Sequence, residues 1–128
     1  MNLFWKKFDK QSIKTQELVS DKIIKILDLI SDKSCWCQRA LARDSEGKNV
    51  GNPWEIQARS WCLSGACFLV CDSVDFEDYN NLQNYLDSSA RELNFSDMTR
   101  LNDLSTHENV IDFLKKCLKN LGYKVVKK

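Results

Sequence analysis

Four side chains of this sequence have the chemistry of a thiol-dependent active site. Cys62 carries a thiol, His107 is the only histidine, and Asn102 and Asp103 lie just before that histidine. A cysteine nucleophile needs a base that takes its proton and a carboxamide or carboxylate that orients the base. These residue types make the four side chains catalytic candidates for a hydrolase, a transferase or a deamidase, if the fold brings them together.

The same residues also have an ordinary structural interpretation. Cys62 lies about two turns inside a predicted helix, whereas a reactive thiolate gains most from a helix N-terminus or a nearby cation. Asn102 and Asp103 are residue types that cap helices and close turns, and His107 suits a surface position at a helix start. We expect Cys62 to pack in the core and keep the catalytic interpretation as the alternative.

A second candidate site combines charge with aromatic rings. Arg43 and Asp44 lie between Trp36 and Trp61 in the sequence. A guanidinium tolerates partial burial and stacks on indole rings. These four residues are therefore binding candidates: Arg43 is expected to act as a structural clamp, paired with Asp44 or Asp103, or to bind an anion in a pocket.

Six cysteines raise the questions of disulfide bonds and of metal. They are Cys35, Cys37, Cys62, Cys67, Cys71 and Cys117. Cys35 and Cys37 are one residue closer than a zinc knuckle requires, there is no second close pair outside a predicted helix, and only one histidine is present. We expect no metal and no other cofactor, and interpret the cysteines as free thiols that pack as small hydrophobic residues.

The composition is that of a single soluble domain spanning residues 1–128. The chain is 43% apolar, and a domain of this size buries roughly two-thirds of the surface that its unfolded chain exposes. The net charge of +1 argues against nonspecific nucleic-acid binding, which needs a surplus of cations, and no specific nucleic-acid partner is expected. Lysines gather in the end segments 1–10 and 122–128, which are candidates for mobile tails.

Hydropathy gives the expected location. No run approaches about 18 apolar residues, so neither a transmembrane helix nor a membrane partner is expected. Lys6 and Lys7 are followed by a polar stretch instead of the apolar core of a secretory signal. The expectation is a cytoplasmic protein with reduced thiols. The expected partner is another protein, and the sequence leaves the oligomeric state open.

Hydrophobic periodicity predicts a mainly α fold with four main helices. Their predicted ranges are 11–31, 53–71, 76–94 and 105–121. Asn52-Pro53 predicts the start of the second helix, and the sequence Ser105-Thr106-His107-Glu108 matches a capping box for the last. Gly122 is expected just beyond its end.

The stretch 35–51 lacks the helical period. It predicts a short β-hairpin or an ordered loop with Gly47 in the turn, which would add local α+β character. Residues 95–104 are expected to be a connection with one helical turn. Gly65 and Ala66 permit close approach of a neighbouring backbone or ring, and packing against a tryptophan is the ordinary explanation.

The order of these motifs resembles a family of small bacterial and phage proteins classed as a domain of unknown function. The resemblance covers about residues 24–121 and implies no activity or cofactor, but it implies that the Trp-Cys helix and the Asn-Asp turn meet in space. Arg39 and the additional cysteines depart from the family pattern. The matching positions are Trp36, Ala42-Arg43-Asp44, Gly47, Pro53, Trp61-Cys62-Leu63-Ser64-Gly65-Ala66, Asn102-Asp103, Thr106-His107, Val110, Phe113 and Leu114.

The sequence thus favours a noncatalytic protein-binding or accessory protein, with a mobile-element origin suggested by the resemblance. The alternative is a small cysteine-dependent enzyme that uses Cys62 and His107.

Overall fold

Helices form most of the structure, a computed structural model that describes residues 18–71 and 76–123. The described part of the first helix covers residues 18–30. The elements that follow are η1 (Lys33–Cys35, a 3₁₀ turn), β1 (Ala42–Arg43), β2 (Ser60–Trp61), α2 (Leu63–Val70), α3 (Phe76–Glu92), α4 (Met98–Leu104) and α5 (His107–Asn120). With its small antiparallel sheet, the fold is α+β.

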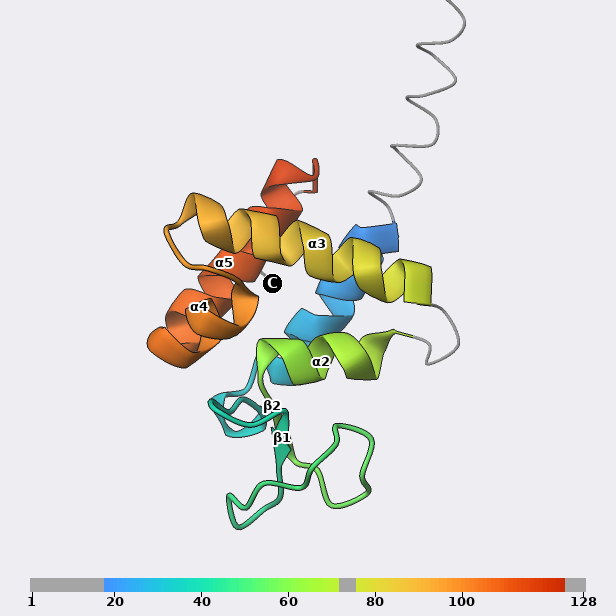
Figure 1. Cartoon of the computed structure of the whole chain (residues 1–128), viewed down its shortest axis with the longest axis vertical. Helices are drawn as coiled ribbons and strands as arrows, with labels where there is room; N and C mark the ends of the chain where they lie inside the picture. Colours follow the sequence, from blue (N-terminus) through green and yellow to red (C-terminus); the bar gives the residue numbers. More distant parts are fainter. Residues whose placement is uncertain (1–17, 72–75, 124–128) are drawn as a thin grey trace, which may run out of the picture.

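The helices pack around one core, and the sheet lies to one side of them. Figure 1 shows α2 and α3 running alongside each other, with α4 and α5 grouped near the C-terminal end of α3. The two strands and their loops project from the N-terminal end of α2. The sheet therefore lies where α2 begins.

Burial confirms the apolar periodicity predicted for the first, third and last helices, except at Leu18 and Leu93, which are each 41% exposed. Ile23, Ile26 and Ile30 of the first helix are fully buried, as are Leu82 and Leu86 of α3. Five of the six cysteines are buried, and all six are free thiols. The interpretation of the cysteines as small core residues agrees with this arrangement for all but the half-buried Cys35.

The predicted start of the second helix at Asn52-Pro53 is wrong, because α2 begins ten residues later at Leu63. The Asn52 side-chain oxygen accepts a hydrogen bond from the Trp54 amide (3.0 Å). An asparagine forms the same local bond in a turn as at a helix N-cap, so the motif alone could not distinguish the two. The chain after Trp54 forms turns and then β2 instead of helix.

The predicted hairpin within 35–51 is only partly present. β1 pairs with the distant β2 in the register Ala42↔Trp61 and Arg43↔Ser60. Within the predicted stretch, Arg43 forms an isolated antiparallel bridge with Asn49, and Gly47 adopts the expected positive φ of 82°. On the other side of β2, Trp36 forms a parallel bridge with Trp61.

The count of four helices is also corrected. Met98–Leu104, predicted as a connection, is a separate helix that begins where the Asp97 carboxylate accepts from the Arg100 amide (2.9 Å). The N-cap of α5 is Thr106, one residue after the predicted serine. Gly122 follows α5 with φ of 91°, as predicted.

Some predicted features lie outside the described residues. These are the tail 1–10, the beginning of the first helix at 11–17, and most of the tail 122–128.

Gly65 is required because α2 crosses the chain that leads into β1. A Cβ atom on Gly65 would overlap the backbone carbonyl of Leu41. The predicted close approach therefore occurs, but the neighbour is a peptide group and not a tryptophan ring.

We expect Gly65→Ala to lower the free energy of unfolding by about 3 kcal/mol or more, because a backbone cannot move aside as a flexible side chain can. Urea unfolding followed by circular dichroism measures this change. Gly47→Ala is the control: it has positive φ but open space around it, so its cost should be near 1 kcal/mol. Equal losses for the two variants would contradict the close approach.

Candidate functional site

The buried carboxamide of Asn102 joins three distant parts of the chain. Its Oδ1 accepts hydrogen bonds from the Trp36 indole nitrogen (2.7 Å) and from the Leu63 amide (3.1 Å). Its Nδ2 donates to the Cys37 carbonyl and to the Asp103 carboxylate, both at 3.1 Å. The side chain is fully buried, and the four bonds use the full hydrogen-bonding capacity of a carboxamide.

The end of α4 is held by two further residues, Gln38 and Arg39, of the segment after Trp36. Gln38 Nε2 donates to the carbonyls of Asn102 (3.0 Å), Asp103 (3.2 Å) and Ser105 (2.8 Å). The Asp103 carboxylate accepts from the Arg39 amide (2.9 Å). The last carbonyls of a helix lack partners within the helix, so the Gln38 side chain caps α4.

His107 connects the start of α5 to the end of the first helix. Its Nε2 lies 2.7 Å from the carbonyl oxygen of Ile30. Since a carbonyl only accepts, Nε2 carries the proton of this hydrogen bond. The ring also packs against Trp36, with ring centroids 5.5 Å apart.

Cys62 is the N-cap of α2 and does not lie within a helix as predicted. Its Sγ accepts a hydrogen bond from the Gly65 amide (3.3 Å), and the residue is only 4% exposed. The pKa of the Cys62 thiol is raised to about 11, chiefly by burial; the hydrogen bond from the Gly65 amide lowers it and the nearby Cys37 thiol contributes to the rise. A helix N-terminus normally favours a thiolate, but here the loss of hydration outweighs that effect.

The fold gathers the predicted catalytic residues without pairing the thiol with the imidazole. Asn102 and Asp103 bond to each other, and Trp36 lies between Asn102 and His107. The Cys62 sulfur bonds to α2 and the His107 ring to the first helix. No hydrogen bond joins Cys62 to His107, both of which the structure describes.

Arg43 bonds to backbone oxygens. Its guanidinium donates to the carbonyls of Gly47 and Gln38, each at 3.0 Å. It forms no ion pair with Asp44 or Asp103, all three being described residues. The geometry is that of a clamp on two loops.

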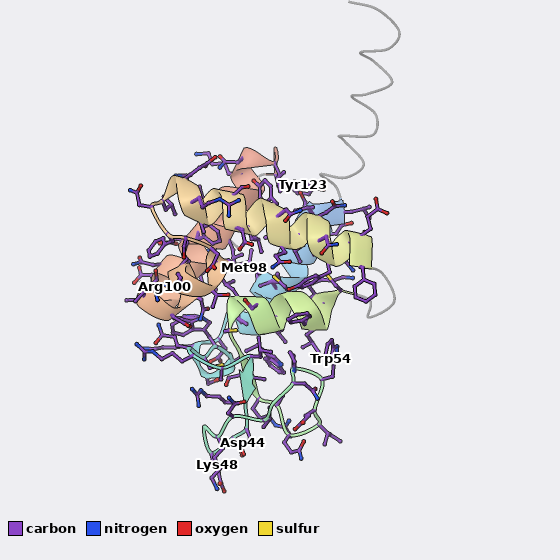
Figure 2. The ribbon with its side chains drawn as sticks, in the orientation of Figure 1. Asp44, Lys48, Trp54, Met98, Arg100 and Tyr123 are labelled. Atoms are coloured by element: carbon purple, nitrogen blue, oxygen red, sulfur yellow. The ribbon has the colours of Figure 1, made fainter. Side chains whose placement is uncertain are left out.

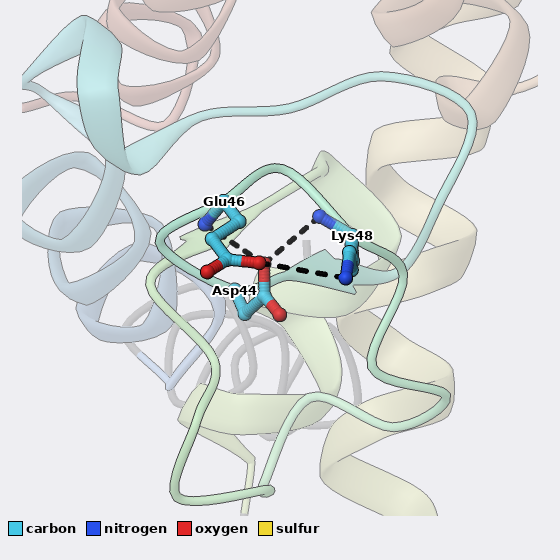
Figure 3. Close-up of polar contacts among 3 residues, drawn as sticks. All are labelled: Asp44, Glu46 and Lys48. Carbon is cyan, nitrogen blue, oxygen red and sulfur yellow. Dashed lines mark hydrogen bonds and ion pairs between the residues drawn. The ribbon is translucent and has the colours of Figure 1, made fainter.

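Asp44 forms a turn. Its carboxylate accepts from the amides of Glu46 and Lys48 at 2.9 Å each, and the Lys48 side chain pairs with Glu46 at 3.5 Å (Figure 3). Trp61, the other indole of the predicted pair, donates to the Pro53 carbonyl (3.0 Å) and so holds the loop between β1 and β2.

Three aromatic residues, partly or largely exposed, form a surface group that the sequence patterns did not indicate. The rings of Trp54 and Phe68 meet edge to face with centroids 6.0 Å apart, and Phe68 stacks on Tyr79 at 4.6 Å. Trp54 extends from its loop toward α2 (Figure 2). We call these three residues, together with the neighbouring Ile56 and Phe76, the aromatic face.

Much of the aromatic face is open to solvent. Ile56 is 87% exposed, Phe76 76% and Trp54 52%. Trp54 and Phe68 fall within the predicted helix 53–71, and Tyr79 within the predicted helix 76–94. The sequence signal that could have indicated an exposed Trp54 is the motif Asn52-Pro53-Trp54, which fits a turn as well as a helix start.

The described residues contain no group of three or more histidine, cysteine or acidic side chains placed to hold a metal ion. Among the helices in 18–71 and 76–123, none combines the length and the hydropathy that crossing a membrane requires.

A family model described as a family of unknown function, DUF6197, matches residues 14–120. The chain belongs to this family. No curated protein and no solved structure shows significant similarity to it. In this DUF6197 member the Trp-Cys segment and the Asn-Asp pair, which lies within α4, do meet, as the resemblance implied, through the bond from the Leu63 amide to Asn102.

We expect Asn102→Ala to lower the free energy of unfolding by about 3 kcal/mol or more, because it leaves several buried donors and acceptors without partners. Thermal or urea unfolding measures the loss. Asn84→Ala is the matched control: Asn84 is exposed on α3, and such a surface change should stay within about 0.5 kcal/mol. A similar, small loss for both variants would show that the Asn102 bonds contribute little.

Proposed function

We propose that this protein is a noncatalytic protein-binding domain and that the aromatic face is its binding surface. The observation that carries the proposal is the exposure of Ile56, two residues after Trp54, and of Phe76, one turn before Tyr79 on α3, close in sequence to the ring series Trp54–Phe68–Tyr79. Burying a large apolar side chain contributes about 1.5–3 kcal/mol. Because the rings already contact each other, a partner would lose little side-chain entropy in ordering them.

The charges beside the aromatic face favour a partner segment that carries lysine or arginine around apolar side chains. Glu55 lies between Trp54 and Ile56, and Glu77 and Asp78 follow Phe76. The nearby Arg59 guanidinium donates to the Ile56 and Ala58 carbonyls of its own loop (2.7 and 2.8 Å). Carboxylates at the rim of an interface attract cationic partners and exclude acidic ones.

The alternative function is a hydrolase, transferase or deamidase that uses Cys62 and His107, with Asn102 or Asp103 as the orienting group. Several observations weigh against it. With a pKa of about 11, only about one Cys62 thiol in ten thousand is ionised at pH 7. The carboxamide of Asn102, the proposed orienting group, is fully engaged by backbone, indole and carboxylate groups.

A cytoplasmic location and a bacterial or phage mobile-element origin stay predictions of the sequence. The same holds for the absence of specific nucleic-acid binding and of a cofactor.

Thiol labelling distinguishes the binding protein from the enzyme. With iodoacetamide on the folded protein between pH 6.5 and 8, we expect Cys35, the half-buried thiol, to react and Cys62 to react only after denaturation. Peptide mass spectrometry locates the label, and Cys35→Ser should remove most labelling of the folded protein. Selective modification of Cys62 below pH 7 would favour the enzyme instead.

A pair of surface variants tests the aromatic face. We expect the double variant Ile56→Ser/Phe76→Ser to lose a partner that the tagged wild-type protein retains in cells that naturally produce it, measured by quantitative mass spectrometry. Leu104→Ser, which changes another exposed apolar residue (61%) on α4, is the control and should retain that partner.

Salt screens the attraction between the carboxylates beside the aromatic face and a cationic partner, so the affinity for the identified partner should fall as ionic strength rises.

Identical sets of captured proteins for wild type and the double variant would overturn the proposal.

A further inference from the structure

Cys37 and Cys62 occupy matching positions on two neighbouring chains. They directly follow Trp36 and Trp61, which form the parallel bridge, and the Cys37 amide donates to the Trp61 carbonyl (3.1 Å). Both chains are extended here, with φ and ψ of −117° and 141° at Trp36 and −80° and 176° at Cys62. Neighbouring strands lie about 4.8 Å apart, and disulfides join Cα atoms about 4.4–6.8 Å apart.

The two thiols also lie on one face of this pairing. Side chains alternate along extended chains, so the residues after Trp36 and Trp61 share the face opposite the indoles. Ser60, two residues before Cys62, shares it too. Burial raises the pKa of the Cys37 thiol, and a hydrogen bond with the Ser60 side chain lowers it. Burial also raises the pKa of Cys62; the Gly65 amide lowers it, and the Cys37 thiol raises it. Ser60 and Cys62 are therefore both close to the Cys37 sulfur.

We propose that Cys37 and Cys62 are a redox pair that forms a disulfide bond when the protein meets hydrogen peroxide. One thiolate attacks the peroxide and becomes a sulfenic acid, releasing water. The other thiol then displaces the hydroxyl group and releases a second water. Two cysteines lose two electrons and two protons in total, and one peroxide is reduced to two water molecules.

Cys37 is the thiol that peroxide attacks first. It is 8% exposed against 4% for Cys62, and its Sγ donates to the Ala40 carbonyl (3.5 Å). Cys62 then needs no access to solvent, because its reaction partner is the neighbouring sulfur. A small oxidant can therefore pair two thiols that a bulky reagent does not reach.

The bond would add a covalent link at the point where Asn102 already holds both chains. Asn102 bonds to the Cys37 carbonyl and to the Leu63 amide, one residue after Cys62. When it forms the disulfide, the Cys62 sulfur would lose the hydrogen bond that it accepts from the Gly65 amide as the N-cap of α2. Closing the loop 38–61 restricts the unfolded chain, so oxidation should stabilise the fold.

The test is oxidation of the full-length folded protein. After treatment with a small excess of hydrogen peroxide at pH 8.5 and blocking of the remaining thiols with N-ethylmaleimide, we expect mass spectrometry to find the loss of two hydrogen atoms. Digestion should give a linked pair of peptides that contain Cys37 and Cys62 and that dithiothreitol separates. The oxidised protein should melt about 5 °C or more above the reduced protein.

Single variants assign the pair. Cys37→Ser and Cys62→Ser should each abolish the linked species, and serine at position 62 can still cap α2, so this variant should fold. Cys35→Ser should leave the bond intact. The proposal is overturned if another pair such as Cys67 and Cys71 is linked, if only Cys35 is oxidised, or if all thiols survive.

Discussion

The fold depends on one buried carboxamide. Asn102 lies 66 residues from Trp36 and 39 from Leu63 in the sequence, yet its side chain bonds to both. A buried amide without partners costs several kcal/mol, so any arrangement that separates these groups leaves polar atoms unsatisfied in an apolar interior. The carboxamide therefore selects one relative placement of α4, the start of α2 and the segment after η1.

Several other features follow from that placement. With the start of α2 held against Asn102, Gly65 lies on the Leu41 carbonyl and the Cys62 thiol is enclosed at the helix N-terminus. The positive end of a helix and the exclusion of water act on a thiol in opposite directions. Because the site is nearly closed to solvent, desolvation prevails and the pKa of Cys62 rises to about 11. Residue types that can form a catalytic triad are here used to join secondary-structure elements.

The aromatic face obeys a different constraint. Its members come from the loop before β2, from α2 and from α3, and its rings contact one another while Ile56 and Phe76 stay open to solvent. Nothing in the Asn102 network requires this exposure, since the core is closed without it. Exposed apolar side chains that gather on one face are typical of interaction surfaces.

The sequence by itself determined the features that depend on neighbouring residues. Periodicity identified the first helix, α3 and α5, and conformational preference identified the positive φ of Gly47 and Gly122. Each of these follows from interactions within a few residues. The match of the family model to residues 14–120 likewise depends on the amino-acid sequence alone.

Only the tertiary structure decided where α2 begins, which strand pairs with β1, and which side chains meet at Asn102. The local bond of Asn52 suits a turn as well as a helix, and the choice was made by the pairing of Ser60–Trp61 with Ala42–Arg43. Gln38 could not be identified as the cap of α4, because its three carbonyl partners lie more than 60 residues away. Such contacts depend on the path of the whole chain, and spacing along the sequence contains no information about that path.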